Sequence, residues 1–300
     1  MLWFILLIIL VILGGAGYYF TRVLIYPQTT PFDKTRAQAI EWGYLDELVY
    51  SSWAMEELIV RSPHGYDIAA VYHPVEGSKR TVVLTHGIYF SRFGGVKYAP
   101  LFYKRGFNVL VYDLRNHGHS GGKNTSYGYY EKDDLKALVD WAFTRLGPGG
   151  IVGTMGESLG AATSLQHAAI DPRIAFVVSD SAFSDVSELV AYRLYEDYHL
   201  PRFPMVPLGN LFTRLVAGWW FRQASPIRCV GQIETPIYFI HGLNDTFILP
   251  KMGEELYQAK QHGIRKLYLA PNAGHVEAMQ KNPAEYDAKL GEFLTEIGLT

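Results

Sequence analysis

The sequence predicts an α/β protein in which a mostly parallel, doubly wound sheet carries a small helical insertion and follows a membrane-spanning helix. Short, continuously apolar runs alternate along the chain with segments whose apolar residues recur at helical spacing. Strands that are apolar throughout are buried on both faces, so the parallel sheet needs a helical layer on each side. A charge-free apolar run at the N-terminus adds the helix that we expect to cross a bilayer.

The composition is that of a chain with one large domain. The 300 residues are 49% hydrophobic, which suffices for an α/β domain of about 250 residues with a substantial core. The net charge is −2 and the basic residues are scattered, which excludes a nucleic-acid-binding surface. Cys229 is the one cysteine of the chain, so an intramolecular disulfide is excluded as well.

Residues 1–21 form the predicted membrane anchor. Met1–Phe20 contain no charged side chain, and at helical rise they span about 30 Å, the thickness of a bilayer's hydrocarbon core. Tyr18, Tyr19 and Arg22 lie at the end of this run, where aromatic and basic residues meet the membrane interface. A buried core helix is disfavoured because the run has no polar face. A cleaved signal peptide stays open, since Gly15–Gly17 are small, although no lysine or arginine precedes the run.

The charges that follow the anchor predict its orientation. By the positive-inside rule, they place the body of this single-pass protein on the cytoplasmic side. These charges are Arg22, Lys34 and Arg36. Residues 22–54 are expected to be a linker with a short helical piece, because Pro27 and Pro31 interrupt regular structure at its start.

The main domain is predicted to cover residues 55–300. It begins with a hairpin, in which residues 56–60 and 67–72 flank the turn Ser62–Gly65. Six buried strands are then expected, at 81–85, 107–112, 150–155, 174–178, 236–240 and 266–269. Helical patterns lie between them, around 98–104, 135–143 and 161–165, and a closing amphipathic helix covers 286–297. Active sites of such sheets lie at the carboxyl ends of the strands.

A segment at about 184–231 interrupts this alternation and is predicted to form a small cap. Helical patterns near 186–198 and 208–221 are separated by three prolines. The cap is rich in aromatic side chains. Two interpretations stay open: these side chains seat the cap on the body, or they line a pocket for an acyl or other apolar substrate.

The sequence Gly156-Glu157-Ser158-Leu159-Gly160 is the candidate catalytic motif. It joins an apolar strand pattern to a helix of small residues, which is the arrangement of a nucleophile elbow. Small residues two positions before and after the serine are needed because the strand and the helix approach closely there. The helix N-terminus supplies N–H groups and a positive dipole end suited to an oxyanion. A glycine-rich turn with a solvent-facing serine is the alternative.

A serine nucleophile needs a base and an acid that orients the base. The candidate base is His275, in a glycine-containing loop after the last strand, although it is one of ten histidines. The candidate acid is Asp245, just after the strand at 236–240. Asp180 also ends a strand and is the competing candidate. We favour Asp245 because it precedes His275 by one strand and follows its own strand at a similar offset.

These residues carry a resemblance to the α/β-hydrolase superfamily, whose catalytic residues follow the order of Ser158, Asp245 and His275. Three further segments resemble motifs of that superfamily: Thr85-His86-Gly87-Ile88, Asp113-Leu114-Arg115-Asn116-His117-Gly118-His119-Ser120 and His241-Gly242-Leu243-Asn244-Asp245. The match covers roughly residues 55–300. It is closest to serine-aminopeptidase-like and monoacylglycerol-lipase-like esterases with a short helical cap.

The resemblance implies a serine hydrolase that uses no cofactor or metal and cleaves carboxylic esters through an acyl-enzyme. It further implies that the backbone N–H groups of Ile88 and Leu159 form the oxyanion hole. Arg115, His117 and His119 are interpreted as loop-structuring residues, with a His-Gly-His metal site as a minor alternative. Amide or peptide cleavage and a non-catalytic binding module are the alternative functions. The expected partners are a small-molecule or acyl-ester substrate and, through the N-terminal helix, a membrane.

Overall fold

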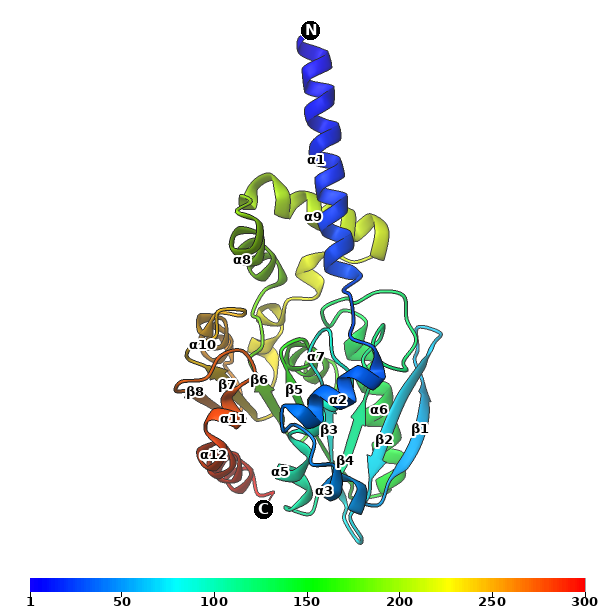
Figure 1. Cartoon of the computed structure of the whole chain (residues 1–300). Helices are drawn as coiled ribbons and strands as arrows, with labels where there is room; N and C mark the ends of the chain where they lie inside the picture. Colours follow the sequence, from blue (N-terminus) through cyan, green and yellow to red (C-terminus); the bar gives the residue numbers. More distant parts are fainter. Residues whose placement is uncertain (300) are drawn as a thin grey trace.

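The computed structural model describes residues 1–299. Thr300, the last residue of the predicted domain, lies outside this description, as do the side chains of Leu2 and Ile9 in the predicted anchor. A sheet with the strand order β1-β2-β4-β3-β5-β6-β7-β8 forms the centre of the molecule (Figure 1). The strands are β1 (Glu56–Arg61), β2 (Asp67–His73), β3 (Arg80–Thr85), β4 (Asn108–Tyr112), β5 (Ile151–Glu157), β6 (Val177–Asp180), β7 (Ile237–Gly242) and β8 (Arg265–Ala270).

The sheet is parallel from β4 to β8, and β1 and β2 are antiparallel additions at one edge. Successive side chains of a strand point to opposite faces, so both faces of this apolar sheet need cover. In β4, Val109 and Val111 join one core cluster, whereas Leu110 and Tyr112 join the other. The predicted mostly parallel, doubly wound fold is confirmed.

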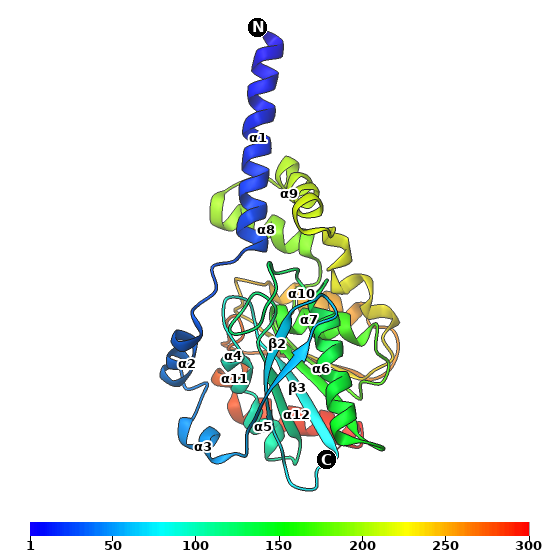
Figure 2. The same ribbon diagram turned by 90° about the vertical axis from the view of Figure 1, so that its right-hand side faces the viewer.

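Helices cover both faces of the sheet (Figure 2). One face carries α6 (Glu131–Leu146), α7 (Leu159–Ala168) and α10 (Pro250–Ala259). The other carries α4 (Phe93–Val96), α5 (Ala99–Tyr103), α11 (Ala278–Lys281) and α12 (Pro283–Glu296). The carboxyl ends of the parallel strands therefore meet at a single edge, where the loops that bear the candidate catalytic residues begin.

The N-terminal helix α1 (Leu2–Ile25) projects from the body (Figure 1) and continues past residue 21. Among the described residues, Trp3–Ile25 is the one helical stretch long and apolar enough to cross a membrane. Its most apolar part is only 12% buried, unlike the core helix of a soluble protein, whereas a signal sequence meets the same criterion. Two short helices, α2 (Phe32–Glu41) and α3 (Glu47–Ser52), occupy nearly half of the predicted linker.

The segment between β6 and β7 contains α8 (Val186–Tyr198), α9 (Arg202–Ala217) and three 3₁₀ helices: Phe221–Gln223, Pro226–Arg228 and Val230–Gln232. The predicted start of the second helix at 208 is wrong. Phe203 has non-helical backbone angles, and Pro204 and Pro207 lie within the first turn after it. Pro204 is the first helical residue after Phe203, where the N–H has no intrahelical acceptor, so this proline removes no hydrogen bond, whereas Pro207 lies inside the helix.

The sixth strand also differs from the prediction. The apolar run at 174–178 suggests a strand, but β6 begins at Val177 and ends at Asp180. Polar Ser179 and Asp180 are fully buried because they continue the strand between β5 and β7. Hydrophobicity marks buried residues, and here the ladder continues into buried polar residues that hydrophobicity does not reveal.

Candidate active site

Ser158 lies at a sharp turn between β5 and α7, with φ 53° and ψ −117°. Residues other than glycine rarely adopt this backbone conformation, and such strain is retained where the surrounding structure enforces it. A Cβ atom added to Gly156 would lie 2.2 Å from the backbone of Gly160. One added to Gly160 would lie 2.2 Å from the carbonyl oxygen of Thr85. Both glycines are therefore required by the close packing of α7 against β3 and β5.

The structure brings Ser158, His275 and Asp245 together. The imidazole Nε2 of His275 is 2.9 Å from Ser158 Oγ, and its Nδ1 is 2.7 Å from Asp245 Oδ2. These distances allow His275 to accept the serine proton while Nδ1–H donates to the carboxylate. Asp180 does not take this position. Its carboxylate accepts hydrogen bonds from Tyr98, Tyr286 and Ser181 instead.

Asp245 is held in one orientation by three hydrogen bonds. Oδ1 accepts the backbone N–H groups of Phe247 and Ile248, both at 2.9 Å. Oδ2 accepts from His275 and also lies 3.2 Å from His241 Nε2, whose nearer partner is Ile248 O at 2.8 Å. Burial acts to raise the pKa of Asp245, but the hydrogen bonds from His241 and His275 outweigh it and hold the pKa well below its ordinary value. The carboxylate is therefore ionised at neutral pH.

The two predicted oxyanion donors flank Ser158. Leu159 is the first residue of α7, so its N–H lies in the turn that has no intrahelical acceptor. The N–H of Ile88 has no hydrogen-bond partner in the described part of the chain. Ile88, Leu159 and Ser158 all line one cavity. The arrangement can therefore offer two N–H groups to a negatively charged oxygen beside Ser158.

Two histidines hold the loop that carries Ile88. His86 Nδ1–H donates to Gly87 O, and its Nε2 accepts the N–H of Leu114 at 2.9 Å. His117 Nε2 accepts the N–H of Tyr89 at 3.2 Å. Burial lowers the pKa of His86 to about 3, so this residue stays neutral and keeps its acceptor nitrogen. The loop after β4 thus fixes the loop after β3, in agreement with the loop-structuring role expected for His117.

A buried ion pair behind Ser158 was not predicted from the sequence. Lys97 Nζ lies 2.6 Å from Glu157 Oε2, and the two side chains are 1% and 6% exposed. The same ammonium group donates to Val276 O at 3.1 Å. Burial acts to lower the pKa of Lys97, but attraction to Glu157 raises it above its ordinary value. Lys97 thus connects the residue before the serine to the residue after His275.

Val276 has φ 54°, an unfavourable conformation for a β-branched residue. Lys97 holds its carbonyl group, and its N–H lies 3.4 Å from Ser181 Oγ. The strain is therefore maintained from both sides, directly beside His275. A lysine between two helical segments gives no sequence signal of this role, because its partners are distant in the chain.

We expect Lys97→Met to destabilise the fold by about 3–5 kcal/mol, because Glu157 would remain as an unpaired buried charge. Lys97→Met combined with Glu157→Gln should recover a large part of this loss. Urea unfolding of the wild type, both single variants and the double variant measures the coupling. Additive effects of the two substitutions would contradict the pairing.

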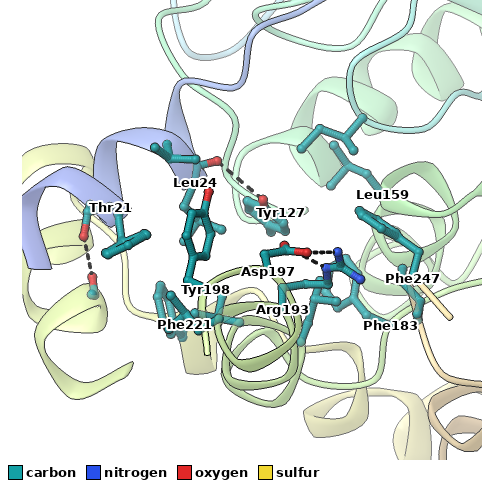
Figure 3. A pocket seen from close by; sticks show the side chains of 18 of the residues that line it. Thr21, Leu24, Tyr127, Leu159, Phe183, Arg193, Asp197, Tyr198, Phe221 and Phe247 are labelled. Atoms are coloured by element: carbon teal, nitrogen blue, oxygen red, sulfur yellow. Dashed lines mark hydrogen bonds and ion pairs between the residues drawn. The ribbon is translucent and has the colours of Figure 1, made fainter. Parts of the chain in front are cut away.

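Two cavities meet at Ser158. The cap-side cavity, of about 180 Å³, extends from Ser158 between α1, α8 and α9. Figure 3 shows Thr21 and Leu24 of α1 opposite Leu159, Phe183 and Phe247 across this space. The α2-side cavity, of about 490 Å³, extends the other way toward Gln38, Trp42 and Tyr44. A substrate with two arms can therefore place its reacting carbon at Ser158.

The acidic residues that line these cavities are paired. Asp197 in the cap-side cavity forms an ion pair with Arg193, and Glu157 in the α2-side cavity forms one with Lys97. Among the described residues, no group of three or more potential ligands could hold a metal ion. His117 accepts the N–H of Tyr89, and His119 stacks on Phe32 of α2. The contribution of α1 to a cavity was also missed, because the apolar run of residues 1–20 resembles a simple tether.

Comparisons with known proteins agree with this fold. Residues 65–202 match the X-Pro dipeptidyl-peptidase (S15) family. The uncharacterized protein YqkD of Bacillus subtilis is 37% identical over 80% of this chain and 79% of its own length. The uncharacterized protein MT2364 of Mycobacterium tuberculosis is 24% identical over 82% and 81%, respectively.

Solved structures of other proteins share this fold. The Pyrococcus furiosus esterase Pf2001 is 27% identical, with a TM-score of 0.68 over 82% of this chain and 92% of that one. The α/β hydrolase GrgF of Penicillium sp. sh18 is 15% identical and shares the fold, with a TM-score of 0.64 over 81% and 98%. With the sheet order, the nucleophile-elbow geometry and these relatives, the chain belongs to the α/β-hydrolase superfamily.

Proposed function

We propose that this protein is a membrane-anchored serine hydrolase that cleaves carboxylic esters. Residues 55–300 form its catalytic domain, residues 184–231 are the cap of that domain, and α1 is the anchor. The observation that carries the proposal is the placement of His275 within hydrogen-bond distance of both Ser158 and Asp245. The similarity to the esterase Pf2001 supports the ester substrate.

The reaction begins when Ser158 Oγ attacks the ester carbonyl carbon and His275 Nε2 takes the serine proton. Asp245 stabilises the imidazolium, and the N–H groups of Ile88 and Leu159 stabilise the oxyanion. His275 then protonates the departing alkoxide, so the alcohol leaves and an acyl-enzyme remains. A water molecule gives a proton to His275 and attacks the acyl-enzyme. The carboxylic acid is released, and Ser158 regains its proton.

Amide or peptide cleavage is the second candidate, because residues 65–202 match the S15 peptidase family. An aminopeptidase-type site needs an unpaired carboxylate to hold the substrate's α-amino group. Asp197 and Glu157 both have basic partners, which favours an uncharged ester. We expect p-nitrophenyl esters to be cleaved faster than aminoacyl p-nitroanilides of matched size, as measured by kcat/KM. Faster turnover of the anilides would reverse this ranking.

A fluorophosphonate probe tests the catalytic role of Ser158. We expect the probe to label the wild type and Ser164→Ala but not Ser158→Ala. Ser164 is a matched control, since it is a buried serine of α7 whose hydroxyl donates to Gly160 O. Equal labelling of all three proteins would reject Ser158 as the nucleophile. An unlabelled but folded wild type would favour a non-catalytic binding module.

The anchoring of α1 is supported by its packing as well as by its length. Gly17, Thr21 and Ile25 are buried at intervals of one helical turn, so one face of α1 packs on the rest of the protein, with Gly17 and Thr21 against α9 of the cap. A signal peptide that is removed would leave this surface uncovered. For the orientation, we propose the cytoplasmic side. Protease added outside sealed vesicles of known orientation tests this, because a cytoplasmic body in right-side-out vesicles stays intact.

A further inference from the structure

The cap-side cavity is built partly by the membrane helix itself. The lining residues from α1 are Phe20, Thr21, Val23 and Leu24. Figure 3 shows the end of α1 beside Tyr127, whose hydroxyl donates to Leu24 O at 3.4 Å. The anchor is therefore a wall of the cavity that contains Ser158.

This wall is fixed to the cap by close contacts. A Cβ atom added to Gly17 would lie 2.9 Å from Leu208 Cβ, so α1 and α9 approach as closely as a glycine allows. Thr21 Oγ1 donates to Gly209 O at 3.3 Å. The ring of Phe20 packs edge-on against Tyr198 of α8, with a centroid distance of 4.8 Å. The N-terminal helix and the cap therefore form one unit.

The cavity lining is suited to a hydrocarbon chain. Away from Ser158, most of its side chains are apolar, and the charged Arg193 and Asp197 are paired with each other. The apolar members contributed by the body and the cap include Leu159, Phe183, Leu194, Phe221 and Phe247. Such a lining favours an acyl chain by burial of methylene groups rather than by directed hydrogen bonds.

The cavity lies at the level where α1 would leave a bilayer. Arg22 stacks over Tyr26, and Tyr18 and Tyr19 precede it, as at a membrane interface. Two cavity-lining residues are half exposed beside α1: Val23 (44%) and Tyr198 (48%). On α9, further apolar side chains are exposed: Phe203, Leu211 and Leu215. These positions together give the cap an apolar surface next to the span.

We propose that the substrate is a lipid ester of the bilayer, whose acyl chain enters the cap-side cavity past Val23 and Tyr198 and along α1. This inference rests on the proposed ester hydrolysis and adds its substrate class and route of entry. The carbonyl carbon then reaches Ser158, and the alcohol part of the lipid occupies the α2-side cavity. Water splits the ester into a fatty acid and an alcohol by the steps given above.

The first experiment measures the acyl-chain preference. With the full-length protein in phosphatidylcholine vesicles, kcat/KM for p-nitrophenyl esters should rise from acetate to octanoate by about fourfold for each methylene group that is buried. Gly209→Leu should lower the ratio of octanoate to acetate by about tenfold or more. An added Cβ on Gly209 has ordinary contacts at 3.7 Å and beyond, so the rest of a leucine side chain can occupy the cavity.

Gly14→Leu is the matched control, because Gly14 is also helical, has nothing within 4 Å of an added Cβ and does not line the cavity. It should leave the ratio unchanged. Val190→Trp on α8 is a second cavity-filling variant, in case Gly209→Leu does not fold; fluorophosphonate labelling reports an intact site. A flat chain-length profile, or the same ratio in Gly209→Leu, Val190→Trp and Gly14→Leu, would overturn the acyl cavity.

The second experiment tests the route of entry. A long-chain monoacylglycerol is placed either in the vesicles that contain the protein or in separate, protein-free vesicles. Faster hydrolysis in the shared vesicles supports entry from the bilayer, and equal initial rates would overturn it. Failure of the proposed function gives a different result, because the wild type would then neither hydrolyse acetate nor react with the fluorophosphonate.

Discussion

Replacing Ser158 by alanine should lower kcat for p-nitrophenyl butyrate by about 10⁶-fold. The substitution removes the one oxygen that lies within hydrogen-bond distance of His275 Nε2 at the elbow, so no acyl-enzyme can form. Binding and the N–H groups of Ile88 and Leu159 remain, so a small rate above the uncatalysed reaction should persist. Steady-state kinetics on purified protein measures the loss.

Ser164→Ala serves as the control for this loss. Its hydroxyl bonds within α7 and lies in the same buried helix, so the two variants share any general effect of losing a buried hydroxyl group. A Ser158→Ala protein that keeps more than about one hundredth of the wild-type kcat would contradict the nucleophile assignment.

Asp245→Asn should lower kcat by about 10⁴-fold, because it reverses the tautomer of His275. The orientation of the new amide is set by its surroundings. The position of Oδ1 accepts the N–H groups of Phe247 and Ile248, so the amide oxygen must stay there. The amide NH₂ group then faces His275 Nδ1 and donates to it. The imidazole proton moves to Nε2, which can no longer accept the proton of Ser158.

Asp180→Asn is the informative comparison for this prediction. Asp180 is as deeply buried and also ends a strand, but its partners are Tyr98, Tyr286 and Ser181. We expect it to change kcat by less than about tenfold once the fraction of folded protein is taken into account. A loss of 10⁴-fold in Asp180→Asn, with little change in Asp245→Asn, would show that the acid was assigned wrongly. Fluorophosphonate labelling at saturation gives the fraction of intact sites.

The sequence predicts the sheet well because buried parallel strands are continuously apolar. It also places Ser158, Asp245 and His275 at one edge, since each follows the carboxyl end of a strand. The preference for Asp245 over Asp180 rests on that offset, and in the structure Asp245 Oδ2 lies 2.7 Å from His275 Nδ1. These features depend on local pattern and on the order of elements, both of which a single sequence contains.

Contacts between distant segments were harder to predict. Lys97 meets Glu157 and Val276 only after the sheet is assembled, and nothing near Lys97 in the chain indicates a buried charge. The boundaries of β6 were shifted because its last residues are polar yet buried. The sequence does not predict the role of α1 in the cavity either, because a uniformly apolar segment does not reveal which of its faces contacts protein.

In the proposed membrane-anchored hydrolase, the packing of Gly17, Thr21 and Ile25 has a consequence for any attempt to release the catalytic domain. Cleavage after α1, which would free the rest of the protein for crystallisation or secretion, would also remove one wall of the cap-side cavity beside Ser158. The released fragment should still hydrolyse short, water-soluble esters but should bind long acyl chains more weakly. On this proposal, the solubility of the fragment and its acyl-chain preference are coupled, so engineering one would alter the other.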